Sequence, residues 1–255
     1  MRNVWIICRK ELRSYFVSPI AYILLAIFAV VFGFFFWNGV GIFVYEGIES
    51  QMRGAMFPMN VNEQLIRPLI SNMAVIGLFL IPLISMRLFA EEKRSGTFEL
   101  LATSPIRDFA IIFGKWLAAV LLYGGMLLLS ALNFAWLFRY GNPDWKPLAI
   151  AYLGLFLQAG FMLAVGTFIS SLTRNQIIAG AVSFTVCLLF WVFGWVSEYD
   201  STPVARVMAY LSIPMHFESF GKGVLSVKDA VFFVSAIFLG LFLTARSLES
   251  LRWRS

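Results

Sequence analysis

Long runs without a charged residue constrain this chain more than any other feature of its sequence. The first such run extends from residue 14 to residue 45. A helix of about 20 apolar residues crosses the hydrocarbon core of a bilayer, and a charge near its centre costs about 3 kcal/mol or more. Charged residues make up 13% of the chain, compared with about 25% in soluble domains. The sequence therefore predicts an all-α polytopic membrane protein.

The apolar runs predict six transmembrane helices within a single membrane domain that covers residues 1–255. Polar segments separate them, the longest being a predicted loop over residues 44–68. Lys115 falls near the start of the third span, and we expect its side chain to reach the headgroups by snorkelling. The last run is short, so it would need snorkelling flanks or a thinner bilayer. The predicted spans are residues 19–43, 68–86, 109–138, 147–172, 177–196 and 230–245.

The segment before the first span, residues 1–18, has the pattern of an amphipathic helix. Arg2, Arg9 and Arg13 fall on one line of a helical wheel, and mostly aromatic and apolar residues share another arc, into which Glu11 fits poorly. This pattern is typical of a helix that lies in the membrane interface. The alternative is a simple extension of the first span into the cytoplasm.

Residues 87–104 form a strongly charged segment between two apolar runs. Charged and apolar side chains alternate in it, so it cannot lie within lipid. We predict a short helix at the membrane surface, on which another protein pushes. The alternative interpretation is that the charges only keep a connecting loop in water. The charged residues at its centre are Glu91, Glu92, Lys93, Arg94 and Glu99.

The distribution of positive charge predicts the orientation. With six spans both termini lie on the same side, and most of the 20 lysine and arginine residues fall on that side. The positive-inside rule makes it the cytoplasmic side, which also places residues 87–104 in the cytoplasm. A five-span alternative would leave Arg252 and Arg254 on the opposite side.

The residues that membrane enzymes and pumps need do not occur in a usable pattern. The single histidine, His216, falls in a predicted outer loop. We interpret it as a polar interfacial residue, in preference to a metal ligand. Neither Gly-Lys pair, at Gly114 and at Gly221, is followed by the Ser or Thr of a P-loop. Cys8 and Cys187 are not expected to form a disulfide. We therefore expect no enzymatic activity, cofactor or metal in this chain, and any energy must come from a partner.

Four segments carry a resemblance to a known family. They are ICRKELRSYFVSPIAYI, MRLFAEEKRSGTFELLATSPI, SSLTRNQIIAG and IPMHFESFGKGVLSVKD, and they cover most of the chain in order. Together they resemble the permeases of type-2 ABC exporters, with the closest likeness to the bacterial gliding-motility branch. The run Glu-Glu-Lys-Arg-Ser-Gly-Thr in the second segment is the most specific part.

The resemblance implies a particular assembly. Residues 4–16 would form an elbow helix carrying Arg9 and Arg13, and residues 207–221 would form short re-entrant helices. A coupling helix within residues 87–104 would dock on an ATPase subunit that holds ATP and Mg²⁺. Two ATPase copies and a second permease chain, identical or not, would complete the transporter. The implied contacts to the ATPase or the elbow helix are Phe89, Glu91, Glu92, Lys93, Arg94, Thr97 and Glu99.

The resemblance also implies a path for the substrate and the membrane in which the protein lies. Spans one, two and five would line its path, offering Phe35, Asn38, Asn72 and Phe190, although aromatic residues in spans more often serve packing. The apolar lining favours an amphiphile, a lipid-linked molecule or a hydrophobic peptide. The expected location is the bacterial inner membrane, with room for an accessory or periplasmic protein and no nucleic acid. The alternative is a membrane scaffold of an ABC-type complex that transports nothing, such as a motility apparatus.

Overall fold

The computed structural model describes residues 2–52, 60–97, 106–141, 143–199 and 202–252, and in these residues the regular elements are helices. A short π-helical turn, η1, leads into the second long helix. In chain order the elements are α1 (Arg2–Val17), α2 (Ile20–Met52), η1 (Asn62–Ile66), α3 (Arg67–Ser85), α4 (Ala90–Ser95), α6 (Asp108–Tyr140), α7 (Trp145–Leu172), α8 (Gln176–Tyr199), α9 (Pro203–Leu211), α10 (Ile213–Gly221) and α11 (Val227–Arg252).

Six helices in the described part of the chain are long and apolar enough to cross a membrane, which confirms the all-α polytopic fold. Two of them differ from the predicted spans. The first, α2, has 33 residues and continues to Met52, so the predicted loop over 44–68 is wrong in its first part. The last, α11, has 26 residues. At a rise of 1.5 Å per residue it is about 39 Å long, so it extends beyond the predicted span at both ends.

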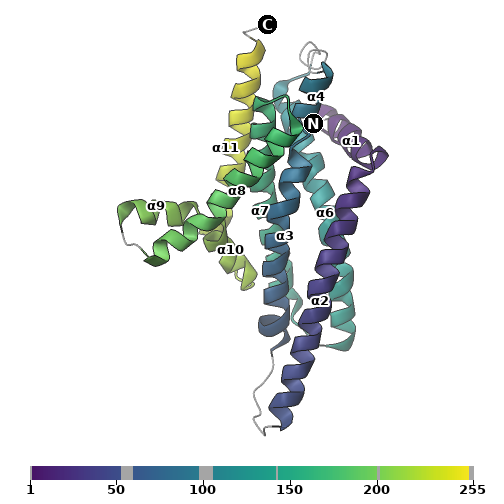
Figure 1. Cartoon of the computed structure of the whole chain (residues 1–255), viewed down its shortest axis with the longest axis vertical. Helices are drawn as coiled ribbons and strands as arrows, with labels where there is room; N and C mark the ends of the chain where they lie inside the picture. Colours follow the sequence, from purple (N-terminus) through teal and green to yellow (C-terminus); the bar gives the residue numbers. More distant parts are fainter. Residues whose placement is uncertain (1, 53–59, 98–105, 142, 200–201, 253–255) are drawn as a thin grey trace.

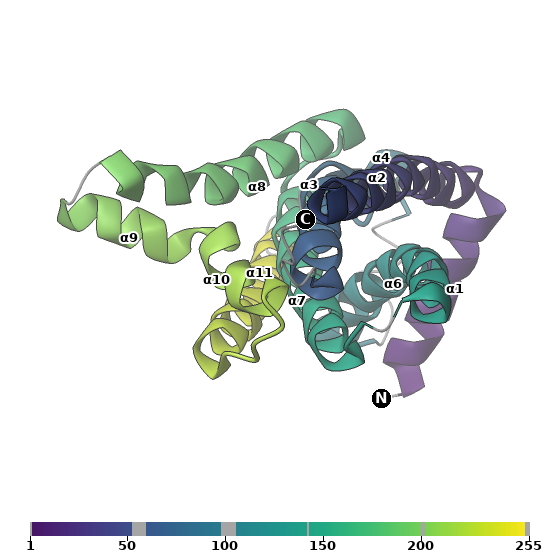
Figure 2. The same cartoon turned by 90° about the horizontal axis from the view of Figure 1, so that it is seen from below.

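The helices form a bundle around α7, which contacts α3, α6, α8, α10 and α11. Figure 1 shows α2 along one side of this bundle, while α8 leans away on the other side and leads to α9. In the view from below, α1 lies beyond α6, at the opposite side from α9 (Figure 2). Both termini and α4 lie at the same end of the molecule (Figure 1).

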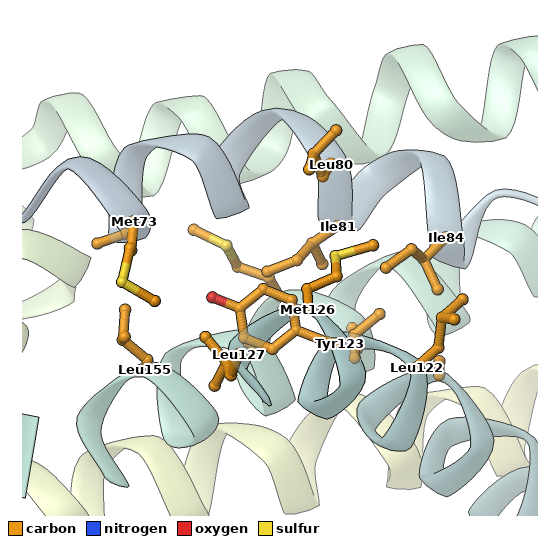
Figure 3. Packing of buried hydrophobic residues seen from close by; sticks show 14 of the residues in the cluster. Met73, Leu80, Ile81, Ile84, Leu122, Tyr123, Met126, Leu127 and Leu155 are labelled. Atoms are coloured by element: carbon orange, nitrogen blue, oxygen red, sulfur yellow. The ribbon is translucent and has the colours of Figure 1, made fainter. Parts of the chain in front are cut away.

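The best-buried part of the core lies where α3 meets α6 and α7. Figure 3 shows Met73 and Ile81 of α3 facing Tyr123 and Met126 of α6, with Leu155 of α7 beside them. Each of these five side chains is at most 1% exposed. Because lipid is as apolar as leucine, helices in a membrane associate through close van der Waals packing more than through the hydrophobic effect. The interlocked side chains of α3, α6 and α7 provide that packing.

Candidate functional site

The short helix α4 is attached to the end of α7 by hydrogen bonds. The backbone N–H groups of Phe89 and Ala90 donate to the buried Ser170 Oγ at 3.1 and 3.0 Å. Ser170 Oγ in turn donates to the Met86 carbonyl at 3.0 Å. One hydroxyl therefore satisfies three backbone groups of the turn that joins α3 to α4. After six residues α4 ends at Gly96, whose φ of 74° is readily adopted only by glycine.

Lys115 lies at the centre of a buried ion-pair network. Its Nζ is 2.8 Å from Glu11 Oε1 of α1 and 2.9 Å from Glu92 Oε1 of α4, while Lys115 itself belongs to α6. The residue is 1% exposed, and its Nζ also lies 5.4 Å from the centre of the Phe89 ring. The prediction that Lys115 snorkels to the headgroups is therefore wrong. Two carboxylates hold its ammonium inside the protein.

The electrostatics of this network are balanced. Lys10 on the exposed side of α1 lies 3.8 Å from Glu92 Oε1, so two cations meet two carboxylates. A buried ion that loses its partner costs about 3–5 kcal/mol, whereas a complete buried set can be close to neutral in free energy. The network therefore makes the relative position of α1, α4 and α6 highly specific.

A second set of contacts ties α1 to the end of α3. The Tyr15 hydroxyl donates to the Ile84 carbonyl at 3.2 Å, and burial raises the pKa of Tyr15, so the phenol keeps its proton. The Arg87 guanidinium lies 5.1 Å from the centre of the Tyr15 ring. Its Nε also pairs with Glu91 Oε2 at 2.9 Å. The turn after α3 is thus held by both α1 and α7.

The face of α1 that packs against the protein includes part of the predicted apolar arc. Cys8 and Tyr15 are buried together with Ile7, whereas Trp5 and Phe16 are exposed on the same side as the arginines. Part of the predicted apolar arc thus packs against the protein, and the remaining aromatic side chains, Trp5 and Phe16, stay on the outer surface of the helix. Burial, and then the nearby Glu11 carboxylate, raise the pKa of the Cys8 thiol. Arg9 and Arg13 are both exposed to the surroundings of the molecule.

The residues predicted to contact a partner fall into two groups. Glu91, Arg94 and Thr97 are exposed. Phe89 is buried and Glu92 and Lys93 are partly buried, with the Lys93 ammonium donating to the Ser171 carbonyl of α7. Glu99, the remaining residue predicted here, lies outside the described residues.

The residues predicted to line a substrate path do not come together in this chain. Asn38 is exposed on α2 and donates to the Phe34 carbonyl of its own helix at 2.9 Å, and Phe35 is exposed nearby. Phe190 of α8 instead packs edge-on against Phe161 of α7, with ring centres 5.4 Å apart. Asn72 is partly buried on α3, the helix that contacts both α2 and α8.

His216 lies in the segment between the last two long helices. It belongs to α10 and is 4% exposed. Its Nδ1 lies 2.7 Å from Asp229 Oδ1, and Ser219 Oγ donates to Asp229 Oδ2 at 2.5 Å. The Ser-His-Asp composition resembles a hydrolase triad, but the His216 Nε2 faces the Tyr210 carbonyl at 2.8 Å. The serine therefore has no imidazole nitrogen beside it, and these side chains do not have the order of a nucleophile–histidine–carboxylate triad.

Glu11 and Ser170 were missed by the sequence analysis, and Lys115 was misplaced by it. A signal existed for two of them, because Glu11 interrupts the helical pattern of residues 2–16 and Lys115 interrupts a span. Two misplaced charges of opposite sign are a reason to look for a pair. Nothing in the sequence distinguishes Ser170 from the neighbouring Ser171.

Comparison with known proteins fits this arrangement. The family model described as "ABC-2 family transporter protein" matches residues 5–239, which is most of the chain. Comparison with curated proteins finds no match. In the described residues no group of three or more His, Cys, Asp or Glu is placed to hold a metal ion. With six helices long and apolar enough to cross a membrane and a family match over nearly its whole length, the chain belongs to the ABC-2 family of transporter proteins and is a membrane-embedded permease subunit of an ABC transporter.

Proposed function

We propose that this chain is the permease of an ATP-driven exporter and that α4 is its coupling helix. Two ATPase subunits would hold ATP and Mg²⁺, and their closure would push on the exposed side of α4. In this account both termini and α4 lie in the cytoplasm, and the membrane is a bacterial inner membrane. A second permease chain completes the pore, and an accessory or periplasmic membrane protein can join it.

The observation that carries this proposal is the ion-pair network of Lys115. Motion applied to α4 reaches α1 and α6 through Glu92 and Lys115, and it reaches α3 and α7 through the turn that Ser170 holds. A buried charge cannot be left without its partner at low cost. The helices are therefore expected to move with α4 as one unit.

The exposed and inward sides of α4 have different roles in this account. Glu91, Arg94 and Thr97 are available to an ATPase surface, because all three are exposed. Glu92 is committed to Lys115 and transmits the motion. Variants on the two sides are therefore expected to fail at different steps.

The substrate path is proposed along the interface with the second permease chain. Phe35 and Asn38 of α2 are exposed, so a second copy of the membrane domain could face them. Asn72 and Phe190 would border the path only after a rearrangement, because both are partly enclosed in this chain. The apolar surface favours an amphiphile, a lipid-linked molecule or a hydrophobic peptide as substrate.

The experiment compares two variants of the complex purified with its ATPase. Arg94→Glu is expected to lower the amount of ATPase that copurifies, because it reverses a charge on the exposed side. Glu92→Gln is expected to keep the ATPase bound but to lose transport of an added amphiphile in vesicles. Arg139→Glu, an exposed charge reversal at the far end of α6, is the matched control and should change neither.

Two outcomes would contradict the proposal. If Glu91→Lys combined with Arg94→Glu leaves both ATPase association and transport intact, α4 is not the docking element. If ATP hydrolysis in reconstituted vesicles is not stimulated by amphiphiles, lipid-linked molecules or hydrophobic peptides, while the complex stays assembled, the chain is a scaffold and not an exporter.

A further inference from the structure

His216 lies where the three helices α9, α10 and α11 meet. It is the only histidine of the chain and is 4% exposed. Its ring stacks on Phe232 of α11, with centres 3.8 Å apart and planes 15° apart, and it meets the Tyr210 ring of α9 edge-on. A polar ring buried this deeply requires partners for both of its nitrogen atoms.

Both ring nitrogens of His216 face hydrogen-bond acceptors. Nδ1 lies 2.7 Å from the Asp229 carboxylate and Nε2 lies 2.8 Å from the Tyr210 backbone carbonyl. A backbone carbonyl and an ionised carboxylate can only accept a hydrogen bond. A neutral imidazole donates from one nitrogen, whereas an imidazolium donates from both. The imidazolium is therefore the form that satisfies this geometry completely.

The two partners favour a positive charge for separate reasons. The Tyr210 carbonyl belongs to the last turn of α9, which ends at Leu211, and the negative end of a helix dipole favours a cation. Asp229 supplies a formal negative charge at the start of α11. Ser219 Oγ donates to its second oxygen at 2.5 Å, which leaves Oδ1 for the imidazole. The face of Phe232 adds an aromatic surface, which attracts cations.

Other charged residues on the surrounding helices are engaged away from the ring. Glu218 of α10 pairs with Lys222 at 2.5 Å and with Arg67 of α3 at 3.9 Å. Lys228 of α11 lies 5.7 Å from the centre of the Tyr210 ring. Asp229 is the only charged side chain in the described residues that is paired with the imidazole. The remaining charged residues of the helices packed around it are Arg206 on α9, Lys146 on α7, Glu198 on α8 and, in the last turns of α11, Arg246, Glu249 and Arg252.

We propose that His216 is a proton-dependent pin that holds α9, α10 and α11 together. With two ring protons it links α10 to both neighbours. When it loses one proton, either the link to Tyr210 or the link to Asp229 must break, because the bare nitrogen then faces an oxygen lone pair. The pin is therefore complete at low pH and weakens as pH rises. It makes the α9–α10 segment responsive to the pH of the compartment that it faces.

The first test uses the unmodified chain in nanodiscs, with ¹⁵N-labelled histidine. Because His216 is the only histidine, its two nitrogen signals need no assignment by mutation. Both nitrogens are expected to carry protons at the pH at which residues 203–221 are protected from hydrogen exchange. Raising the pH should remove one proton and lower the protection factor of that segment over the same range. The loss of one charge-assisted hydrogen bond corresponds to a fall of about tenfold to a hundredfold.

The second test uses variants that fold but cannot titrate at this position. His216→Asn keeps a donor near the place of Nδ1, and His216→Gln keeps one near the place of Nε2. Both are expected to give low protection of residues 203–221 that no longer depends on pH. Lys222→Gln, also on α10 but paired with Glu218 instead of the imidazole, is the control and should keep the response of the unmodified chain. Helical content and elution volume in detergent verify folding.

Two results would overturn the proposal that His216 links these helices. One is a ring nitrogen without a proton while residues 203–221 stay protected, because the neutral ring would then suffice. The other is a pH response in His216→Asn and His216→Gln equal to that of the unmodified chain. Neither measurement requires the ATPase, so a failure here is distinguishable from a failure of the exporter proposal.

Discussion

At the scale of single residues, the lone lysine of the third span decides how three helices meet. A lysine near a helix end usually extends its stem along apolar surface and leaves its ammonium in water. Lys115 does the opposite, because Glu11 and Glu92 reach it from two other helices. Glu11 fits the pattern of its own helix poorly for the same reason. Each charge is misplaced by itself, and together the three form buried ion pairs.

The network predicts a large effect of removing its central charge. Lys115→Met would leave Glu11 and Glu92 without their buried partner, so we expect a loss of about 3–5 kcal/mol in stability. Thermal unfolding in detergent would measure it. Modification of the buried Cys8 thiol should also become faster, since α1 would separate from α6 more often.

A matched control exists on the same carboxylate. Lys10 also approaches Glu92, at 3.8 Å, but its side chain is 65% exposed, so Lys10→Met should cost less than about 1 kcal/mol. The combined variant Glu11→Gln, Lys115→Met and Glu92→Gln should recover most of the lost stability, because no uncompensated charge remains. Equal destabilisation by Lys10→Met and Lys115→Met would show that the buried network is unimportant.

At the scale of helices, close backbone approach places α1 against α6. A Cβ atom added at Gly114 of α6 would lie 2.9 Å from the Val4 carbonyl and 3.0 Å from Ile7 of α1. The Val4 carbonyl is backbone and cannot move aside as a flexible side chain would. The absence of a side chain at Gly114 is therefore what lets Lys115, the next residue, reach Glu11.

Replacing Gly114 by alanine is expected to destabilise the protein, whereas a glycine-to-alanine change in a helix usually stabilises it. In a helix interior, alanine normally stabilises by about 0.5–1 kcal/mol relative to glycine. Gly125→Ala on the same helix should show that gain, because its nearest neighbour would be 3.9 Å away. Gly114→Ala should lower the unfolding temperature and expose Cys8. A gain in stability from both variants would mean that α1 is not held at this contact.

At the scale of the whole molecule, the two termini and α4 share one end of the bundle (Figure 1). The arginine and lysine residues of α1, α4 and the end of α11 therefore gather there. The positive-inside rule predicts that this positive end lies in the cytoplasm. The end of α6 and the start of α7 lie at the opposite end of the bundle (Figure 1).

Accessibility from the two sides of the membrane would check this orientation. In a Cys8→Ser, Cys187→Ser background, Ser95→Cys on α4 should react with a membrane-impermeant thiol reagent only after the inner membrane is opened. Arg139→Cys, exposed at the far end of α6, should react in intact spheroplasts. The reverse labelling pattern would place α4 outside the cytoplasm and would end the account of ATPase docking.

The sequence by itself determined the class of the fold, because uncharged runs of this length can be satisfied only as helices that cross a bilayer. It also determined where five of the six long helices begin, to within about two residues, since charged or polar residues bound each run. The sequence did not predict the late end of α2 or the early start of α11, because charged residues near a membrane surface are compatible with helix as well as loop.

The tertiary structure alone decided which charges meet. A run of sequence shows that Glu11, Glu92 and Lys115 are unusual, but the three lie on α1, α4 and α6 and are far apart in the chain. The same holds for His216, whose two acceptors come from α9 and α11. Pairing of buried polar groups depends on how helices pack in space, and the periodicity of a single helix carries no information about the neighbour it will face.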